Sequence, residues 1–247
     1  MSARAGASAL AVYRVARRRR WTRVGAGVLL LAAALAARRE ATPTAVVVVL
    51  AGAGLSFLAA GFSGGSCRDP DRWRRGAEGE RLTARLLEAL PSRRWAVWHD
   101  LAVPGSRANI DHLVVGRTGV WVVDTKTTRA PVRVGWRSVR FGEHRLDTGP
   151  ARWEAEVLAD RLQERLGDLL RRPVPVRPIV AVHGSGLRDR GTTVQGVRVV
   201  PAGLLVNRLR RGRRRLGRSA RALVCRAVAE EFGPSSRATI PGGSPTW

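Results

Sequence analysis

Two apolar runs near the start of the chain constrain its fold more than any other feature. They cover residues 24–37 and 45–62, and a short charged segment, 38–43, separates them. As helices they would be about 21 Å and about 27 Å long at ~1.5 Å per residue, close to the roughly 30 Å hydrocarbon core of a bilayer. We therefore predict a hairpin of two transmembrane helices, at about residues 22–38 and 45–62.

Two alternatives to this transmembrane hairpin stay open. Ala34-Leu35-Ala36 resembles the cleavage site of a signal peptide, although the second run would still anchor the protein after cleavage. A buried hairpin in a soluble protein would need a matching apolar surface, which the remaining sequence does not offer.

Arginine is abundant at both outer ends of this hairpin. The basic N-terminal segment, residues 1–23, contains seven arginines and no acidic residue, and the linker that follows the hairpin, residues 63–75, contains four more. Basic flanks are typical of the cytoplasmic side of a membrane. We therefore predict a two-span protein of the cell membrane whose soluble part lies in the cytoplasm, with the bilayer as one partner.

From residue 76 to residue 232 the pattern changes to that of an α/β domain, and the polar tail 233–247 is expected to be disordered. Helical periodicity predicts helices at 77–90, 151–170, 203–211 and 219–232. β-rich runs predict strands at 95–101, 110–115, 120–125, 132–134, 138–141 and 176–182. The last of these runs is continuously apolar, which is typical of a central strand buried on both faces.

The segment Gly116-Arg117-Thr118-Gly119, between two of these strands, is a hairpin signal. If the turn is centred on its two middle residues, Asp111 lies directly opposite Asp124, with Cβ atoms about 4.5–5.5 Å apart. Lys126 lies two residues beyond Asp124 and therefore on the same face of the sheet. The other residues of this face are apolar, so two carboxylates and one ammonium share its end.

Two carboxylates this close repel each other unless a cation lies between them. Lys126, the only lysine among 44 basic residues, supplies one positive charge, and a divalent metal would supply more. Carboxylate oxygens suit Mg²⁺ or Mn²⁺. Glu80, at the margin of the buried side of the first helix of the domain, is a candidate third carboxylate, although an acid in a first helical turn also stabilises the helix dipole.

Cysteines and histidines offer no competing metal site. Cys67 and Cys225 are too few for a disulfide scaffold or a Cys-rich zinc site. His112 alternates to the face opposite Asp111, where we expect a structural role, and the other histidines show no metal-ligand spacing.

Three short motifs occur in order: Gly76-Ala-Glu-Gly-Glu80, Ile110-Asp111-His112 and Asp124-Thr125-Lys126. Together they resemble the nuclease-related domain, NERD, a family placed in the PD-(D/E)XK nuclease superfamily. The resemblance covers about residues 72–185 and implies an α/β fold with a PD-(D/E)XK-like mixed sheet flanked by helices.

This resemblance implies Glu80, Asp111, Asp124 and Lys126 as catalytic residues. The carboxylates and the carbonyl oxygen of Thr125 would hold Mg²⁺ or Mn²⁺. Two departures stand out. The family usually has Glu where this chain has Asp124, and it often has Gln early in the helix after the sheet, where this chain has Pro150-Ala-Arg-Trp153.

A second basic cluster lies near the end of the domain, in a chain of formal net charge +25. Residues 208–221 contain no acid. One interpretation is a surface that contacts nucleic-acid phosphates, and the other is a solvated or lipid-facing turn. Under the first interpretation the contacting residues are Arg208, Arg210, Arg211, Arg213, Arg214 and Arg215. No aromatic residue interleaves them, so base stacking is not indicated.

These observations predict a membrane-anchored nuclease that hydrolyses phosphodiester bonds with Mg²⁺ at the cytoplasmic face, with DNA favoured over RNA. The alternative of another class is a nuclease-derived binding module without turnover that captures nucleic acid or a partner at the membrane. A third alternative is a lipid-surface protein whose charge serves only the bilayer.

Overall fold

The computed structural model describes residues 5–37, 47–48, 51–52, 54, 70–135, 137–170, 172–187 and 191–233. The chain forms two compact units, which we describe separately. The α/β unit comprises Met1–Ala9 and Arg75–Ile240, and the second unit comprises Leu10–Arg74 and Pro241–Trp247.

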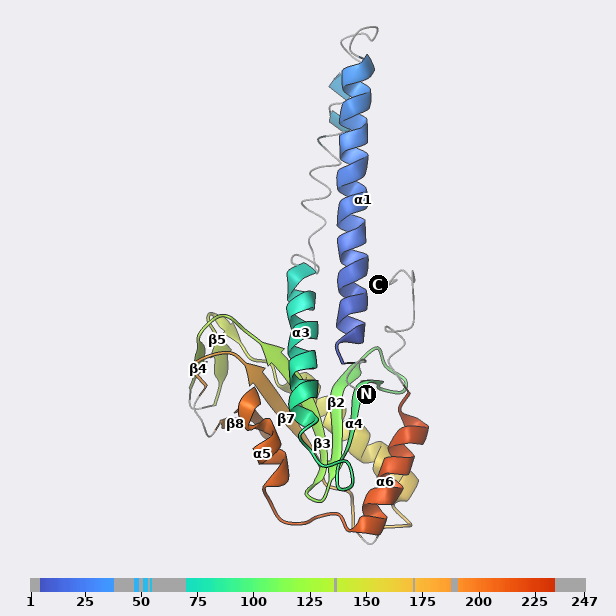
Figure 1. Cartoon of the computed structure of the whole chain (residues 1–247), viewed down its shortest axis with the longest axis vertical. Helices are drawn as coiled ribbons and strands as arrows, with labels where there is room; N and C mark the ends of the chain where they lie inside the picture. The colour runs from blue at the N-terminus through green and yellow to red at the C-terminus, as the bar shows by residue number, and fades with distance from the viewer. Residues whose placement is uncertain are drawn as a thin grey trace. The chain divides into compact units, whose positions relative to one another are not determined.

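Helix α1 spans Ala7–Ala37 and continues without a break through the arginines of the basic N-terminal segment into the first apolar run (Figure 1). Among the described residues, no helix is both long enough and apolar enough to cross a membrane. The predicted span at 22–38 is therefore not supported, since its uninterrupted apolar part, residues 24–37, is shorter than the ~20 residues that a span needs. The predicted span at 45–62 lies outside the described residues except at 47–48, 51–52 and 54.

The α/β unit is built on a six-stranded mixed sheet with the order β1-β2-β3-β7-β9-β8. Its strands are β1 (Ala96–Ala102), β2 (Asn109–Gly116), β3 (Gly119–Thr127), β7 (Val176–His183), β8 (Thr192–Val194) and β9 (Val197–Pro201). The pairs β3–β7 and β7–β9 are parallel, and the remaining pairs are antiparallel. This confirms the predicted mixed sheet and places the apolar strand β7 in its interior.

Helices cover both faces of this sheet (Figure 1). Helices α4 (Gly149–Leu166) and α6 (Arg218–Glu231) pack on the face that presents Leu113 and Val122. Helices α3 (Pro70–Leu87) and α5 (Leu205–Arg210) contribute to the cluster on the face that presents Val114 and Val123. Leu158 of α4 and Leu205 of α5 are fully buried, so each helix contributes its apolar side to a separate core.

The β2–β3 hairpin has the predicted register. Val115 pairs with Val120 and His112 pairs with Val123 across the ladder, and one further step brings Asp111 opposite Asp124. Gly119 in the turn has φ +124°, and a Cβ there would lie 2.7 Å from the carbonyl oxygen of Pro175. Glycine is therefore required where the turn meets the segment before β7.

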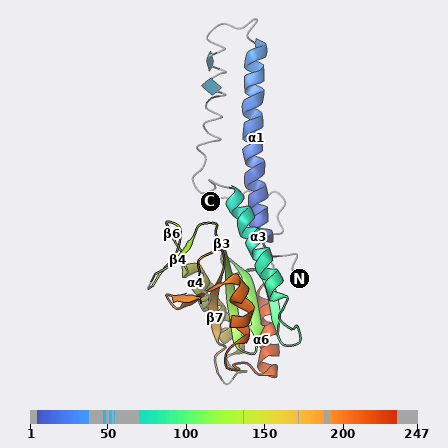
Figure 2. The same cartoon turned by 60° about the vertical axis from the view of Figure 1, so that its left-hand side comes forward.

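A small three-stranded sheet, β4 (Val132–Val134), β5 (Val139–Phe141) and β6 (His144–Arg145), follows β3 (Figure 2). Val132 and Val139 pack against Val180 and Val199 of the main sheet. The strands β8 and β9 were not predicted. Their turn, Gln195-Gly196, has positive φ at both residues, which is typical of a tight hairpin.

Candidate active site

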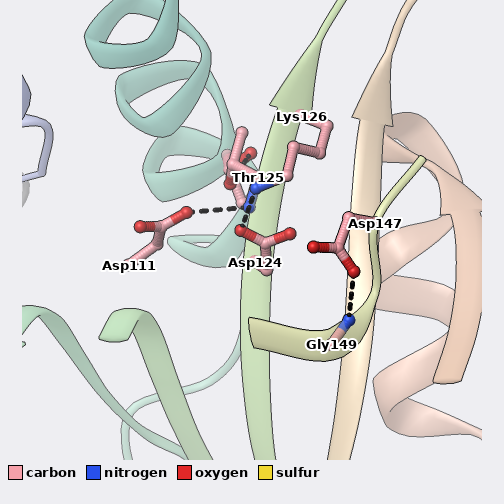
Figure 3. A network of polar contacts seen from close by, with 7 residues as sticks. Asp111, Asp124, Thr125, Lys126, Asp147 and Gly149 are labelled. Atoms are coloured by element: carbon pink, nitrogen blue, oxygen red, sulfur yellow. Dashed lines mark hydrogen bonds and ion pairs between the residues drawn. The ribbon is translucent and has the colours of Figure 1, made fainter. Parts of the chain in front are cut away.

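Asp111, Asp124 and Lys126 meet where β2 begins and β3 ends (Figure 3). The Lys126 Nζ donates a hydrogen bond to Asp124 Oδ1 at 2.6 Å, and the Asp124 side chain is only 12% exposed. The backbone N–H of Thr125 donates to Asp111 Oδ2 at 2.9 Å. The hairpin register thus produces the predicted pair of carboxylates, with the lone lysine on one of them.

Charge is poorly balanced in this cluster. Burial, and then repulsion from Asp124, raises the pKa of Asp111 to about 7, although Lys126 and the Thr125 N–H partly oppose the change. Burial by itself would lower the pKa of Lys126, but the attraction of Asp124 and Asp111 outweighs it and raises that pKa. Lys126 therefore stays charged, while burial and the repulsion from Asp124 favour the protonated form of Asp111.

Glu80 of α3 lies beside the same cluster and is buried, with 8% of its surface exposed. Burial, followed by repulsion from Asp111, raises its pKa to about 9, and its Oε2 has no hydrogen-bond partner. Glu78, two residues earlier, is exposed. Stabilisation of the helix dipole alone would not require burial, so the structure favours Glu80 as a member of the site.

Gly79 explains how α3 comes close enough to deliver Glu80. A Cβ on Gly79 would lie 2.0 Å from the hydroxyl oxygen of Thr127 and 3.3 Å from a methyl carbon of Thr125. A side chain at this position would force the Thr127 side chain to rotate or the helix to move away from the end of β3. The second glycine of the Gly76-x-x-Gly79-Glu80 motif thus acts through close backbone approach.

Glu154, on α4, is a further carboxyl close enough to interact with Asp111 and Asp124, and the sequence interpretation missed it. Burial, then repulsion from Asp111 and Asp124, raises its pKa to about 9, and Lys126 opposes the change. It follows directly after the Pro150–Trp153 segment in which the expected Gln is absent. An acidic residue at this position of the helix was visible in the sequence. Helical periodicity alone, however, did not show that its side chain lies at the end of the sheet that carries Asp111 and Asp124.

Asp100 of β1 and the N-terminal residues were also missed. Asp100 is 2% exposed and adopts φ +55°, an unfavourable conformation for a residue other than glycine. Its carboxylate accepts the backbone N–H of Ser8 at 2.9 Å and the Asn109 amide at 3.0 Å. A backbone hydrogen bond from Gly6 reaches Glu80. Gly6 and Ser8 therefore pack beside the carboxylates, which no local pattern could indicate.

Three of the four histidines, His99, His112 and His183, lie on the α3 side of the main sheet. His112 is fully buried and its Nδ1 lies 2.7 Å from Nδ1 of His99, and burial lowers the pKa of both rings. His183 shares a hydrogen bond of 2.8 Å with the Thr83 hydroxyl, which also accepts the Thr125 hydroxyl at 3.1 Å. This packing agrees with the structural role expected for His112. The contacts of His99 and His183 were not predicted from the sequence.

The oxygen donors suit a hard divalent cation, and Oε2 of Glu80, which has no hydrogen-bond partner, is available as a ligand. Within the described residues, however, no group of three or more His, Cys, Asp and Glu side chains has the arrangement of a formed metal site. In Figure 3 the end of β3 is occupied by the ion pair between Asp124 and Lys126. Whether Thr125 offers its carbonyl oxygen to a metal stays a prediction.

The six predicted nucleic-acid-binding arginines, by contrast, lie at the other end of β3. The backbone N–H of Arg215 donates to the carbonyl of Arg117 in the hairpin turn at 2.7 Å. From Gly119 to Asp124 the strand advances five residues, or about 17 Å at ~3.3 Å per residue. The structure therefore separates these arginines from the carboxylates.

Comparisons with known proteins agree with these motifs. Residues 75–183 match the family model of the nuclease-related domain, NERD. An uncharacterized protein of Bacillus anthracis is 40% identical over 58 residues, which cover 22% of this chain and 27% of the relative. The chain thus spans about a quarter of that relative. No solved structure matches the chain.

Proposed function

We propose that this nuclease-related domain hydrolyses phosphodiester bonds of nucleic acid with Mg²⁺ or Mn²⁺. The observation that carries the proposal is the meeting of Asp111 and Asp124 with Lys126, whose Nζ lies 2.6 Å from Asp124 Oδ1. The match of residues 75–183 to a nuclease-related family supports this chemistry.

Asp111, Asp124 and Glu80 would hold the divalent cation, together with the carbonyl oxygen of Thr125. When bound, such an ion activates water and offsets the charge that develops at phosphorus. The raised pKa values of Asp111 and Glu80 support this assignment, because carboxyls that are costly to ionise alone become favourable ligands beside a cation.

Lys126 is the residue that acts on the substrate directly. Its ammonium is 38% exposed at the side chain, so it reaches solvent while Asp124 holds its position. From there it orients the attacking water or stabilises the charge on the phosphate. Asp111 fixes the strand beneath it through the Thr125 N–H.

The test is a cleavage assay on the full chain with labelled duplex DNA, single-stranded DNA and RNA, each in Mg²⁺, Mn²⁺ or EDTA. We expect metal-dependent cleavage that Asp124→Asn abolishes. Asp160→Asn, which removes an exposed carboxylate of α4, is the matched control and should leave cleavage unchanged. No cleavage of any substrate by the wild type would reject the proposal.

A second candidate function is capture of nucleic acid without turnover. It is favoured by the ion pair that Lys126 already forms with Asp124. Salt-sensitive binding of nucleic acid, unaffected by Asp124→Asn and without product in any metal, would support it.

Attachment to a membrane stays a prediction of the sequence alone. It rests on the apolar run at 45–62 and on the arginines around it. A cysteine at position 42, placed in a chain without Cys67 and Cys225, should react with an impermeant reagent outside the cell, and a cysteine at Ser66 should not. The reverse pattern, or recovery of the chain in the soluble fraction, would contradict a cytoplasmic domain on a membrane anchor.

A further inference from the structure

The end of the sheet opposite the carboxylates carries an unbalanced group of arginines. Arg117 stands in the β2–β3 turn and Arg177 at the start of β7, and the tertiary structure brings both to the loop that follows α5. We call these two residues and the six arginines of residues 208–215 the hairpin-end surface. Arg177 was not part of any motif, and neither it nor Arg117 was expected beside the 208–215 cluster.

Specific contacts build this surface. The Arg117 guanidinium donates to the carbonyl of Arg210 at 3.2 Å, and the Arg177 guanidinium donates to the carbonyl of Thr118 at 2.9 Å. Arg177 also lies over the ring of Trp121, 4.8 Å from its centroid. The end of α5 is fixed to the turn, because the Thr118 hydroxyl donates to the carbonyl of Leu209 at 2.8 Å, and the loop is fixed to it by the Arg215 N–H, which donates to the carbonyl of Arg117 at 2.7 Å.

Within the described residues, acidic side chains do not neutralise these charges. In the part of the chain that the structure describes, no arginine of the hairpin-end surface forms an ion pair. Burial, and then the charges of Arg215 and Arg208, lowers the pKa of Arg177. The fold therefore holds like charges together at an energetic cost, and an anionic partner would relieve that cost.

The guanidinium groups of this surface indicate which class of anionic partner it binds. Guanidinium groups pair with phosphate oxygens through two parallel hydrogen bonds. Among the described residues, Trp121 is the aromatic residue that contacts this surface, and it is buried. The hairpin-end surface therefore lacks an exposed ring on which unpaired bases could stack. A duplex presents two phosphate backbones to such a surface, at one charge per about 1.7 Å of helix axis.

We propose that the hairpin-end surface anchors duplex nucleic acid through its phosphates, independently of base sequence and apart from the carboxylate site. The inference rests on the proposed function: the nucleic acid that is cleaved at the carboxylate site also contacts the hairpin-end surface. The two sites lie about 17 Å apart along β3 at ~3.3 Å per residue. That distance corresponds to about five base pairs of a duplex at ~3.4 Å per base pair.

The experiment measures binding of the full chain to two duplexes of unrelated sequence in EDTA, as a function of salt concentration. The test variant is Arg213→Gln, Arg214→Gln and Arg215→Gln combined. The control combines Arg140→Gln, Arg161→Gln and Arg165→Gln, which removes the same charge from arginines that pair with acidic side chains. Thermal melting checks that both variants stay folded.

We expect the test variant to bind both duplexes more weakly, by the same factor. The slope of log K against log salt should flatten by up to about 2.7, at ~0.9 for each lost phosphate contact, while the control keeps the wild-type slope. Equal losses in the two variants would show that net charge alone drives binding and would overturn the proposal. Loss of binding to anionic vesicles with unchanged duplex binding would overturn it in favour of a lipid-facing turn.

Failure of this inference is distinguishable from failure of the proposed function. A wild type that binds as expected in EDTA and never cleaves with Mg²⁺ or Mn²⁺ rejects hydrolysis and keeps the anchor. A wild type that cleaves, with duplex affinity unaffected in the test variant, rejects the anchor and keeps hydrolysis.

Discussion

Replacing Glu80 by Gln should change how the stability of the metal-free domain depends on pH. Its pKa of about 9 in the folded chain compares with 4.5 for the ordinary side chain, and burial is the main cause. Above pH 4.5 the unfolded chain releases this proton while the folded chain keeps it. The folded state therefore binds one more proton, and its stability falls as pH rises toward 9.

The size of the effect follows from the shift. One proton corresponds to about 1.4 kcal/mol per pH unit, so Glu80 by itself lowers the free energy of unfolding by about 4 kcal/mol across roughly three pH units, from pH 5 to pH 8. Gln has nearly the same shape and cannot ionise. We expect Glu80→Gln to remove this part of the slope and to be the more stable protein at pH 8.

The assay is urea unfolding of the full chain in EDTA at several pH values between 5 and 8. Glu78→Gln on the exposed side of the same helix is the control and should keep the wild-type slope. Added Mg²⁺ should restore stability to the wild type most strongly at pH 8, where the carboxyl is easiest to deprotonate, and much less to Glu80→Gln. An identical pH slope in wild type and Glu80→Gln would refute the buried, protonated Glu80.

Three further substitutions test the site. Lys126→Arg keeps the charge but enlarges the group, and a displacement of ~1 Å should lower the cleavage rate on the order of a hundredfold with an unchanged melting temperature; retained activity would exclude a direct catalytic role. Gly79→Ala meets the Thr127 hydroxyl at 2.0 Å and should destabilise the domain by about 1–3 kcal/mol in urea unfolding, whereas a neutral result would mean that α3 does not need this approach. Gly6→Ala, at φ +72°, should speed amide hydrogen exchange at residues 5–9, and Gly25→Ala, which meets nothing within 4 Å, should not; equal exchange in both variants would contradict docking of the first residues.

Much of the hairpin could be predicted because its determinants are local. The turn residues set the register, and alternation along the strand then places Asp111, Asp124 and Lys126 on one face. The rarity of lysine in an arginine-rich chain also distinguishes Lys126 by composition alone.

The membrane prediction shows the opposite case. An apolar run in the sequence shows which residue types are present, but it does not show where the helix that contains them begins. The first apolar run is the second half of a helix that begins at Ala7. Helical periodicity and hydropathy cannot tell where a helix starts when arginines and alanines are both good helix formers.

The sequence by itself determined most of the α/β elements up to β7, the hairpin register and the pair of carboxylates with its lysine, because each depends on residues close together in the chain. Only the tertiary structure decided that Glu80 is buried near Asp100, that Glu154 lies near Asp111 and Asp124, and that Arg177 lies near Arg208 and Arg215. Those neighbours are tens of residues apart in sequence, and the packing of helices on both faces of the sheet brings them together. Their pKa values and charge clusters are therefore properties of the packed domain and cannot be read from any local pattern.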